Sequence, residues 1–512
     1  MLFSFDVMFN KILILIFVLF CVTTLLSQEK WNTLPKLSLK NAQITDMITD
    51  NNNVIVYGDG LTASGSKQGL VIAILDSNGV VLKEKIILDS MGDKLAIDRS
   101  WGKIIKSSKG GYLATAGTVN RKSTILIKLD ESLNIEYLKE YKDSTLSNDF
   151  WQTPLEVKNG YFLYGVQQLL NVKIVGFIKY VDYKGNVFWE KRFAYSQYEN
   201  ILIDLKAVTD STFVFVTAEV ISLVTSTQLP SSRSSIYNID LKGNIGTYWQ
   251  SEPAPKVGYL FNVIPQSNGD FITYGLARKE IVFVDTELIQ PTLTRFDSKF
   301  NILWSYNFGK ITSSGAIHLQ KFFKTIDGNY VGVGQHVEKV GSEPQKSYGW
   351  IYKFSENGNT IWERKFPTPL LPDSFPNGGI LYGVGTLTSG SIMAGGAAKD
   401  GKNYYCWLVK IRNNGCMDTL FCNTTAIDEP LKIDSEVRLF PNPANEYFNL
   451  NLDANKPCTV NIFDQYGRMV LNDTFDTQNI SINTSQFNNG VYFVKVGFGN
   501  SSVRFVRLVV QH

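Results

Sequence analysis

The chain has 512 residues, more than a single domain usually needs, and its 44% hydrophobic content is enough to fill sizeable cores. Its 50 Lys and Arg residues nearly balance its 47 Asp and Glu residues, and no block of like charges appears, so the charge pattern does not favour a nucleic-acid partner. Three histidines leave little material for acid–base chemistry or metal binding. An aromatic content of 13% together with 40 glycines is typical of an all-β protein.

The N-terminal segment is apolar. After Lys11, a run of about 15 apolar or weakly polar residues extends from Ile12 to Leu26, and polarity returns at Ser27. This is shorter than the ~20 residues that cross a bilayer as a helix. We therefore predict a cleaved signal peptide over residues 1–27 and no transmembrane segment in the mature chain. A retained anchor is the alternative, and the start could be Met1 or Met8.

From about residue 40 to 415 the chain repeats one unit of four short strands. In the clearest copy, Asn159-Gly160 makes the first tight turn, Gly165 ends the next strand, Asp182 opens the second turn and Trp189 lies on the fourth strand. The first turn recurs at Asn52-Asn53, Gly110-Gly111, Asn159-Gly160, Asp210-Ser211, Asn268-Gly269, Asp327-Gly328 and Ser389-Gly390. The second turn recurs every 52 to 58 residues, at Asp76, Asp130, Asp182, Asp240, Asp297, Ser355 and Arg412.

Seven copies of a four-stranded unit predict a seven-bladed β-propeller over residues 28–422, because such small sheets bury their faces only against neighbours. A β-solenoid is the competing geometry. Trp189, Trp304 and Trp362 have the same offset from the second turn, so we expect them in the core between blades. The segment from Trp31 to Leu39 is predicted to supply the fourth strand of the seventh blade, although Pro35 suits only an edge strand.

The two tight turns of each unit fall on one face, and the longer connections fall on the other. Within blades, these longer connections are predicted at Leu61–Gly69, Glu219–Ser235, Ala277–Gln290 and Gln335–Tyr348. Between blades, they are predicted at Asp89–Ser100, Asp143–Phe150 and Phe366–Gly379. Variable loops on a rigid scaffold commonly bind ligands, so an extracellular glycan or protein ligand is expected on this long-loop face. Five aromatic residues there could stack on sugars or peptides, or simply pack the loops: Tyr198, Tyr348, Trp350, Tyr404 and Tyr405.

An enzyme is the alternative interpretation. Carboxylates on the long-loop face could serve as general acid and base in a lyase or glycosidase: Asp93, Asp98, Asp143, Asp149, Glu199, Glu252 and Glu338. The spacing of Asp182, Gly185 and Trp189 resembles the tryptophan docking motif of quinoproteins, but with one residue fewer before the glycine and no adjacent cysteines in the chain. The segment Ser355–Trp362 resembles the Asp-box turn of sialidases without its aspartate. No catalytic, cofactor-binding or metal-binding residue is therefore assigned.

The remaining polar candidates are expected to be structural. His318 is predicted before a strand and His336 at the start of a loop. In an exported protein, Cys416 and Cys422 are expected to form a disulfide, which for so short a loop contributes about 2.4 kcal/mol. Cys406 and Cys458 are expected to remain free and partly buried.

Residues 423–436 show no strand alternation and are predicted to be a linker. Beyond them, residues 437–512 show short alternating strands typical of a small Ig-like β-sandwich, predicted at Phe448–Leu452, Thr459–Phe463, Arg468–Asn472, Val491–Val496 and Val503–Val510.

This C-terminal region contains RLFPNPANEYFNL, VNIFDQYGRMV, SQFNNGVYFVKV and VRFVRLVV, in that order. Together they resemble the type A C-terminal sorting domain of Bacteroidetes type IX secretion substrates. The resemblance rests on Pro441, Asn442, Pro443, Gly467, Arg468, Gly490, Val491, Tyr492 and Lys495. It implies contact with the type IX secretion machinery, transit through the periplasm, and a passenger that is secreted or held on the outer cell surface. An Ig-like binding domain that stays attached is the alternative.

Overall fold

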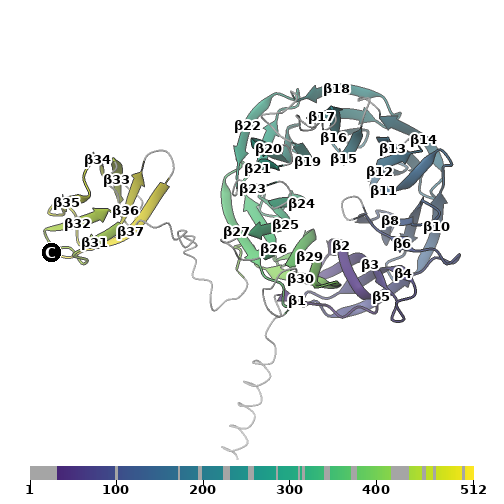
Figure 1. Ribbon diagram of the computed structural model, residues 1–512, viewed down its shortest axis with the longest axis horizontal. Helices are drawn as coiled ribbons and strands as arrows, with labels where there is room; N and C mark the ends of the chain where they lie inside the picture. Colours follow the sequence, from purple (N-terminus) through teal and green to yellow (C-terminus); the bar gives the residue numbers. More distant parts are fainter. Residues whose placement is uncertain are drawn as a thin grey trace, which may run out of the picture. The chain divides into compact units, whose positions relative to one another are not determined.

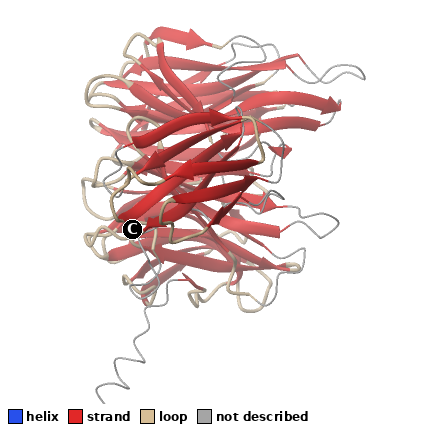
Figure 2. Cartoon of the chain, turned by 90° about the vertical axis from the view of Figure 1, so that its left-hand side faces the viewer, coloured by secondary structure: helices blue, strands red, loops and turns tan. Residues whose placement is uncertain are grey.

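The structure is a computed structural model of the whole chain, and it divides into two compact units, Met1–Cys422 and Asn423–His512. Every regular element among the described residues is a β-strand (Figure 2). The predicted signal peptide and linker lie outside the described residues. The structure describes residues 32–512 except 99–101, 171–172, 194–198, 223–230, 252–258, 284–285, 309–311, 314–316, 339–345, 371–377, 417–436, 453–456, 465–468 and 499–501.

The described part of the first unit forms seven antiparallel sheets, numbered here in chain order. Sheet 1 contains β2 (Lys40–Asp50), β3 (Asn53–Leu61), β4 (Gln68–Leu75) and β5 (Val81–Ile87). Sheet 2 contains β6 (Leu95–Ala96), β7 (Ile104–Lys106), β8 (Tyr112–Thr118), β9 (Ser123–Leu129) and β10 (Ile135–Tyr141). Sheet 3 contains β11 (Leu146–Val157), β12 (Gly160–Leu169), β13 (Ile174–Asp182) and β14 (Val187–Phe193). Sheet 4 contains β15 (Asn200–Ala207), β16 (Thr212–Ser222), β17 (Ser231–Asp240) and β18 (Ile245–Gln250).

The next three sheets continue the pattern. Sheet 5 contains β19 (Tyr259–Pro265), β20 (Phe271–Phe283), β21 (Thr286–Phe296), β22 (Ile302–Asn307) and β23 (Thr312–Ser313). Sheet 6 contains β24 (Ile317–Lys324), β25 (Tyr330–Glu338), β26 (Lys346–Phe354) and β27 (Thr360–Phe366). Sheet 7 contains β28 (Gly378–Thr386), β29 (Ile392–Asp400), β30 (Asn403–Ile411) and β1 (Asn32–Thr33). Figure 1 shows the sheets around a ring, with β2, β15, β19 and β24 on its inner side, so the first unit is a β-propeller.

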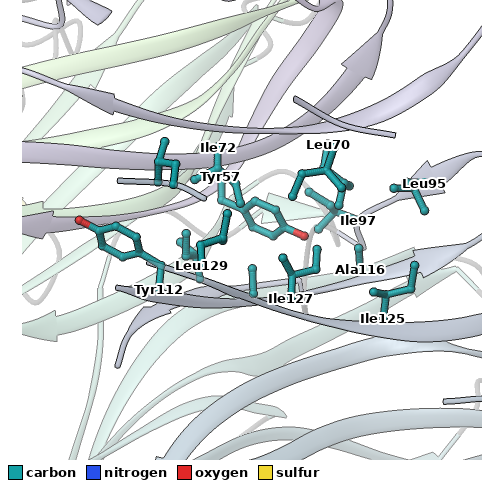
Figure 3. Close-up of a cluster of buried hydrophobic side chains, with 14 of the residues drawn as sticks. Tyr57, Leu70, Ile72, Leu95, Ile97, Tyr112, Ala116, Ile125, Ile127 and Leu129 are labelled. Atoms are coloured by element: carbon teal, nitrogen blue, oxygen red, sulfur yellow. The ribbon is translucent and has the colours of Figure 1, made fainter. Parts of the chain in front are cut away.

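Neighbouring sheets share their hydrophobic cores, as expected for units too small to bury their own faces. Figure 3 shows one such core, in which Tyr57 and Leu70 of sheet 1 lie against Ile127 and Leu129 of sheet 2. All four side chains are fully buried. The Tyr57 hydroxyl also donates to the Thr115 carbonyl oxygen in sheet 2, at 2.9 Å. Stability in this unit therefore depends on contacts between sheets as well as within them.

Where the second turn of a repeat begins with aspartate, that residue closes the turn. Asp182 Oδ1 accepts hydrogen bonds from the backbone N–H groups of Lys184 and Asn186, both at 2.8 Å, and Oδ2 accepts from Asn186 Nδ2 at 2.9 Å. Gly185 has a φ of 79°, a conformation that costs glycine little. The same Asp–Asn clasp recurs at Asp130–Asn134, Asp240–Asn244 and Asp297–Asn301. Both sets of tight turns lie between strands where the sequence predicts them.

The three tryptophans that share the same spacing from the second turn contact the next sheet. Trp189 Nε1 in sheet 3 donates to the carbonyl oxygen of Leu241 in the second turn of sheet 4, at 3.0 Å. Trp362 Nε1 in sheet 6 donates in the same way to Asn413 O at the corresponding turn of sheet 7, at 3.1 Å. The ring of Trp304 lies against Gly358 in the second turn of sheet 6. The prediction that these aromatics pack between repeats is confirmed.

The ring is closed by the N-terminal strand. Strand β1 pairs antiparallel with β30, with Asn32 opposite Val409 and Thr33 opposite Leu408. The prediction that the N-terminal segment adds a strand to the last sheet is confirmed. The described strand is shorter than the predicted Trp31–Leu39 and ends before Pro35, which has no N–H for a ladder.

Replacing Asn32 with alanine tests this closure. Asn32 Oδ1 accepts from Trp407 Nε1 at 2.6 Å, and Asn32 Nδ2 donates to Pro367 O at 3.0 Å. Trp407 is fully buried, so its indole N–H would lose its partner, at a cost of about 1–3 kcal/mol. We expect a matching decrease in the midpoint of chemical denaturation, whereas Asn78→Ala, at an exposed turn position, should change stability by less than about 0.5 kcal/mol. Equal stability of the two variants would show that β1 does not secure the ring.

Several predicted loops are shorter than expected. The stretch predicted as a loop at Ala277–Gln290 is mostly a hairpin, since β20 continues to Phe283 and β21 begins at Thr286. The loops predicted at Glu219–Ser235 and Gln335–Tyr348 also lose residues to strands at both ends. A ladder of backbone hydrogen bonds can continue past the core regardless of side-chain type, so these strands run further than the repeat landmarks indicate.

The second unit contains two sheets among its described residues. One contains β31 (Val437–Phe440), β32 (Tyr447–Leu452) and β35 (Asn479–Asn483). The other contains β34 (Met469–Phe475), β33 (Cys458–Phe463), β36 (Gly490–Phe498) and β37 (Ser502–Val510). Residues from both sheets share one hydrophobic core, including Phe448 and Leu450 from one and Val460 and Val494 from the other. The predicted strands are present, and β31 and β35 are additional.

Candidate functional site

Trp350, one of the five aromatics predicted for the long-loop face, is not available to a ligand. Trp350 lies in β26 and is fully buried, and its Nε1 donates to Glu363 Oε2 at 3.0 Å. Its ring lies 6.0 Å from that of Phe308 and 5.8 Å from that of His336, centroid to centroid. Trp350 is therefore a core residue, and the idea that it stacks on a ligand is wrong.

The remaining aromatics differ in exposure. Tyr405 in β30 is 37% exposed. Its neighbour Tyr404 is half-buried, with Lys399 Nζ 5.8 Å from the centre of its ring. Tyr348 in β26 is also half-buried and lies opposite His336 in β25. Tyr198 lies outside the described residues. Tyr405 is thus the most exposed of the four described aromatics predicted for this face.

The two histidines are in strands and not where the sequence suggested. His318 lies within β24 and His336 within β25. His336 is 3% exposed and lies beside Trp350, which is the environment of a structural core histidine. The predicted structural role of His336 fits this position, although its predicted place in a loop is wrong.

One predicted catalytic carboxylate belongs to a cluster around Arg121. Asp93 accepts hydrogen bonds from three backbone N–H groups, that of Lys94 at 2.7 Å and those of Asn120 and Arg121 at 3.0 Å. Asp89 accepts hydrogen bonds from both terminal nitrogens of Arg121, at 2.7 and 2.9 Å. Burial alone would raise the pKa of Asp93, but the three amides and the Arg121 charge outweigh it and lower this pKa. Asp93 is therefore held ionised and is unsuited to be a general acid.

Asp143 is held in a similar way. It accepts the Thr145 N–H at 2.8 Å and the Thr145 hydroxyl at 2.7 Å, and it pairs with Arg192 Nη2 at 2.5 Å. Burial opposes ionisation, but these partners lower the pKa of Asp143 to about 2. Asp98 lies shortly before β7, and Glu199 directly before β15. Glu252 and the side chains of Asp149 and Glu338 lie outside the described residues. Asp93 and Asp143 each belong to a separate hydrogen-bonded cluster, one around Arg121 and the other around Arg192.

The Arg121 cluster predicts how stability depends on pH. The hydrogen bond from Arg121 lowers the pKa of Asp89 from 3.8 to about 2, so this stabilisation is present above pH 3.8 and is lost as the pH falls toward 2. We expect Arg121→Met to lower the free energy of unfolding at pH 7 by about 1–2 kcal/mol, because the pair is partly exposed. The loss of stability between pH 4 and 2 should be shallower in this variant. Denaturation at several pH values measures both effects, and the exposed neighbour Lys122→Met is the control; identical pH profiles for Arg121→Met and wild type would contradict this role.

Metal and cofactor candidates gain no support from the described geometry. No group of three or more His, Cys, Asp or Glu residues in the described part of the chain is arranged to hold a metal ion. Both carboxylate oxygens of Asp182 are used within its own turn, and Trp189 packs on the next sheet, so the motif resembling that of quinoproteins is a folding element here. No helix in the described residues has the length and hydropathy needed to cross a membrane.

The cysteines fall into two groups. Cys416 is disulfide-bonded, whereas its predicted partner Cys422 lies outside the described residues, so the Cys416–Cys422 pairing stays a prediction. Cys406 and Cys458 are free thiols and are buried. Burial raises the pKa of Cys406 well above its usual range, which makes this thiol unreactive at neutral pH.

In the second unit, the predicted motif at Pro441, Asn442 and Pro443 is exposed and fastens the last strand. Asn442 Nδ2 donates to the carbonyl oxygen of Arg507 at 2.8 Å, and Asn442 Oδ1 accepts the N–H of Val509 at 2.8 Å. A single amide side chain thus satisfies two backbone groups of β37 at the edge of its sheet.

The other motif residues that the structure describes lie in β36. The Tyr492 hydroxyl donates to Asn488 O at 2.9 Å, and its ring stacks on Phe487 with centroids 5.1 Å apart. Gly490 lies opposite Val510, and the half-buried Lys495 lies between its pairing partners in β33 and β37. Gly467 and Arg468 lie outside the described residues. The described motif residues therefore hold the turn before β36 and the pairing of β36 with β37.

The comparison with protein families agrees with this geometry. Residues 438–511 match the family described as "Secretion system C-terminal sorting domain". The second unit is therefore a C-terminal sorting domain of the type IX secretion system, as its sequence motifs suggested. The match covers this unit alone and does not extend to the propeller.

Comparisons with whole proteins are more limited. The chain is 34% identical over 87 residues to an endo-acting ulvan lyase of Formosa agariphila, a match that spans 17% of each protein. Among solved structures, the chain resembles the β-propeller domain of the trilobed protease from Pyrococcus furiosus at 10% identity, covering 75% of this chain and 99% of that one, with a TM-score of 0.41. It also resembles Drosophila Semaphorin 2a at 8% identity, covering 93% of this chain and 98% of that one, again with a TM-score of 0.41. No conclusion about binding or catalysis follows from these structural similarities.

Proposed function

We propose that this protein is an exported binding module: a propeller whose signal peptide (residues 1–27) directs it to the periplasm and whose sorting domain (residues 437–512) passes it through the type IX machinery. The match of residues 438–511 to the sorting-domain family carries this proposal. The destination is the extracellular medium or the outer cell surface of a member of the Bacteroidetes. The type A class of the sorting domain, its Ig-like fold and the linker at 423–436 belong to the same proposal.

The passenger is proposed to be a seven-bladed propeller. Support comes from the seven sheets among the described residues, from the inter-sheet tryptophans, and from the pairing of β1 with β30. Closure through an added N-terminal strand leaves fewer exposed sheet edges, which suits a protein that works outside the cell.

The long-loop face is the proposed binding face for an extracellular glycan or protein. Two features support this proposal. The propeller is a scaffold for the longer connections, and the exposed side chain of Tyr405 lies near the start of β30 in sheet 7. Screening the full-length protein on a glycan array tests this proposal. We expect specific binding that is weakened by Tyr405→Ala and unchanged by Tyr447→Ala, a similarly exposed tyrosine in the sorting domain. Binding that both variants retain in full would argue against a site at Tyr405.

A carbohydrate-active enzyme is the alternative, and it is left open by the similarity to an ulvan lyase, which spans 17% of each protein. A lyase or glycosidase would use carboxylates of the long-loop face outside the saturated Asp93 and Asp143 sites. Loss of polysaccharide chain length on incubation at neutral pH, measured by size-exclusion chromatography, would support the enzyme. Saturable binding with unchanged chain length would support the binding module.

A further inference from the structure

The outer strands of sheets 3 and 6 are fastened to the next sheet in the same way. In both, the tryptophan donates its indole N–H to the second turn of the next sheet. Two residues after the tryptophan, sheet 3 has Lys191, whose Nζ donates to the carbonyl oxygen of Gly243 in that turn. At the same place, sheet 6 has Arg364, whose Nε donates to Gly415 O at 3.0 Å. The repeat therefore uses a tryptophan and a basic residue to hold this junction.

Sheet 5 departs from this arrangement, because Tyr306 takes the place of the basic residue two positions after Trp304. Neither the indole N–H of Trp304 nor the hydroxyl of Tyr306 has a hydrogen-bond partner among the residues that the structure describes. The two rings stack, with centroids 5.1 Å apart and planes at 29°. Both also contact the second turn of sheet 6, since a Cβ on Gly358 would lie 2.7 Å from Tyr306 Cδ2 and 3.0 Å from Trp304 Cζ3. Two rings therefore pack this junction, and their two polar hydrogens remain unused.

The pair of Trp304 and Tyr306 is open to solvent on the rim of the propeller. Figure 1 shows their strand, β22, on the outer side of the ring. Tyr306 is 47% exposed, and Trp304 is half-buried. Because the turn at Gly358 already holds both rings, a ligand that stacks on them would have to order few side chains that are free, which lowers the cost of binding.

Charged groups border this pair of rings. Arg295 in β21 lies directly opposite Trp304 and therefore on the same face of the sheet. Its guanidinium group is paired with Asp270 at 2.9 Å and lies 3.8 Å from Glu356 Oε1. The Glu356 side chain is 52% exposed and belongs to the same turn as Gly358. This turn thus presents a carboxylate beside the rings, which can accept hydrogen bonds from hydroxyl groups and would repel an acidic ligand.

We propose that Trp304 and Tyr306 form a site on the rim that binds a neutral glycan. A sugar ring has an apolar face of C–H groups bordered by hydroxyls, and an aromatic ring with a polar N–H or O–H complements both. The two unused donors serve the sugar oxygens, and the Glu356 carboxylate accepts from sugar hydroxyls. A protein partner fits less well, because a stable protein interface buries at least about 1,200 Å², whereas these features are confined to two rings and one turn. The site lies on the rim, so it does not depend on the binding site proposed at Tyr405.

The test compares full-length wild type and Tyr306→Arg on an array that carries neutral oligosaccharides of glucose, mannose, xylose and galactose together with acidic oligosaccharides of galacturonate. We expect wild type to bind at least one neutral oligosaccharide. Calorimetry should show that Tyr306→Arg binds it at least about tenfold more weakly, because the loss of a tyrosine at the centre of a binding site commonly has an effect of that size. Arginine already stands at this place in sheet 6, as Arg364, so the melting temperature of the variant should equal that of wild type. Loss of binding by this folded variant would therefore report on the site and not on the fold.

The matched control is Phe188→Ala, which removes a 58% exposed aromatic ring from β14, the outer strand of sheet 3, and should leave binding unchanged. Tyr405→Ala should also leave this binding unchanged, so the rim site and the proposed site on the long-loop face can fail independently. If Tyr306→Arg does not fold, Tyr306→Ala carries the same expectation for binding. Equal binding by wild type and the Tyr306 variant, binding of acidic oligosaccharides alone, or binding of no glycan by wild type would each overturn the proposal.

Discussion

Trp362→Ala is expected to lower the free energy of unfolding by about 3–5 kcal/mol, the range found when a buried large aromatic is truncated. Trp362 is 6% exposed and donates its indole N–H to Asn413 O in the next sheet. Its ring also lies against Gly415, where a Cβ would be only 2.8 Å from Trp362 Cδ2. Alanine would therefore leave a cavity between sheets 6 and 7 and remove the hydrogen bond that joins them.

Ile361→Ala provides the matched control. Ile361 is the preceding residue of β27, points to the other side of that strand, and is 45% exposed, so its truncation should cost less than about 0.5 kcal/mol. Chemical denaturation of both variants measures the difference. If the two lose similar stability, the junction between sheets 6 and 7 does not hold the ring together as the geometry indicates.

The repeat could be predicted because its signals are local. Asn159-Gly160 and Asp182 with Gly185 select tight turns through backbone conformation alone, and the recurrence of these turns fixes the strand order. The sequence marked Asp182 as the start of the turn but did not predict the Asp–Asn clasp, because the hydrogen bonds from Asn186 appear only in the structure.

Contacts between distant residues could not be predicted. Arg121 lies 32 residues from Asp89, and Lys321 lies 275 residues from Asp46, so nothing in the local sequence pairs them. A carboxylate such as Asp93 appeared to be a catalytic candidate because its saturation depends on backbone groups that the fold brings to it. Similarly, Trp350 was expected in or beside a long loop, because nothing in the local sequence shows that β26 begins as early as Lys346.

The sorting domain could be predicted from its resemblance to a known family, but the contacts within it could not. The sequence marks Pro441, Asn442 and Pro443 as a motif without showing what the motif contacts. The structure shows Asn442 bound to two backbone groups of β37, more than 60 residues later in the chain. These two hydrogen bonds of Asn442 therefore support the fold of this unit.

The second large effect is expected from deleting the sorting domain. In a host with a working type IX system, deleting residues 437–512 should abolish appearance of the protein outside the cell and leave it in the periplasm. A fluorescent protein fused to residues 430–512 should conversely be exported. Fractionation of the culture followed by immunoblotting measures both. A fusion that stays in the periplasm, or a truncated chain that still reaches the medium, would contradict the sorting role.

Asn442→Ala tests whether export requires the sorting domain to be stably folded, and not only to be present. Loss of two neutral hydrogen bonds should destabilise the unit by about 1–2 kcal/mol and reduce the exported fraction several-fold, because the edge of β37 would lose its anchor. Asn451→Ala, which removes one exposed hydrogen bond to Asn479, is the matched control and should export normally. Normal export of Asn442→Ala despite measurable destabilisation would contradict a need for β37 to be held in place. The machinery would then recognise the exposed surface of Pro441 and Pro443 or another part of the unit.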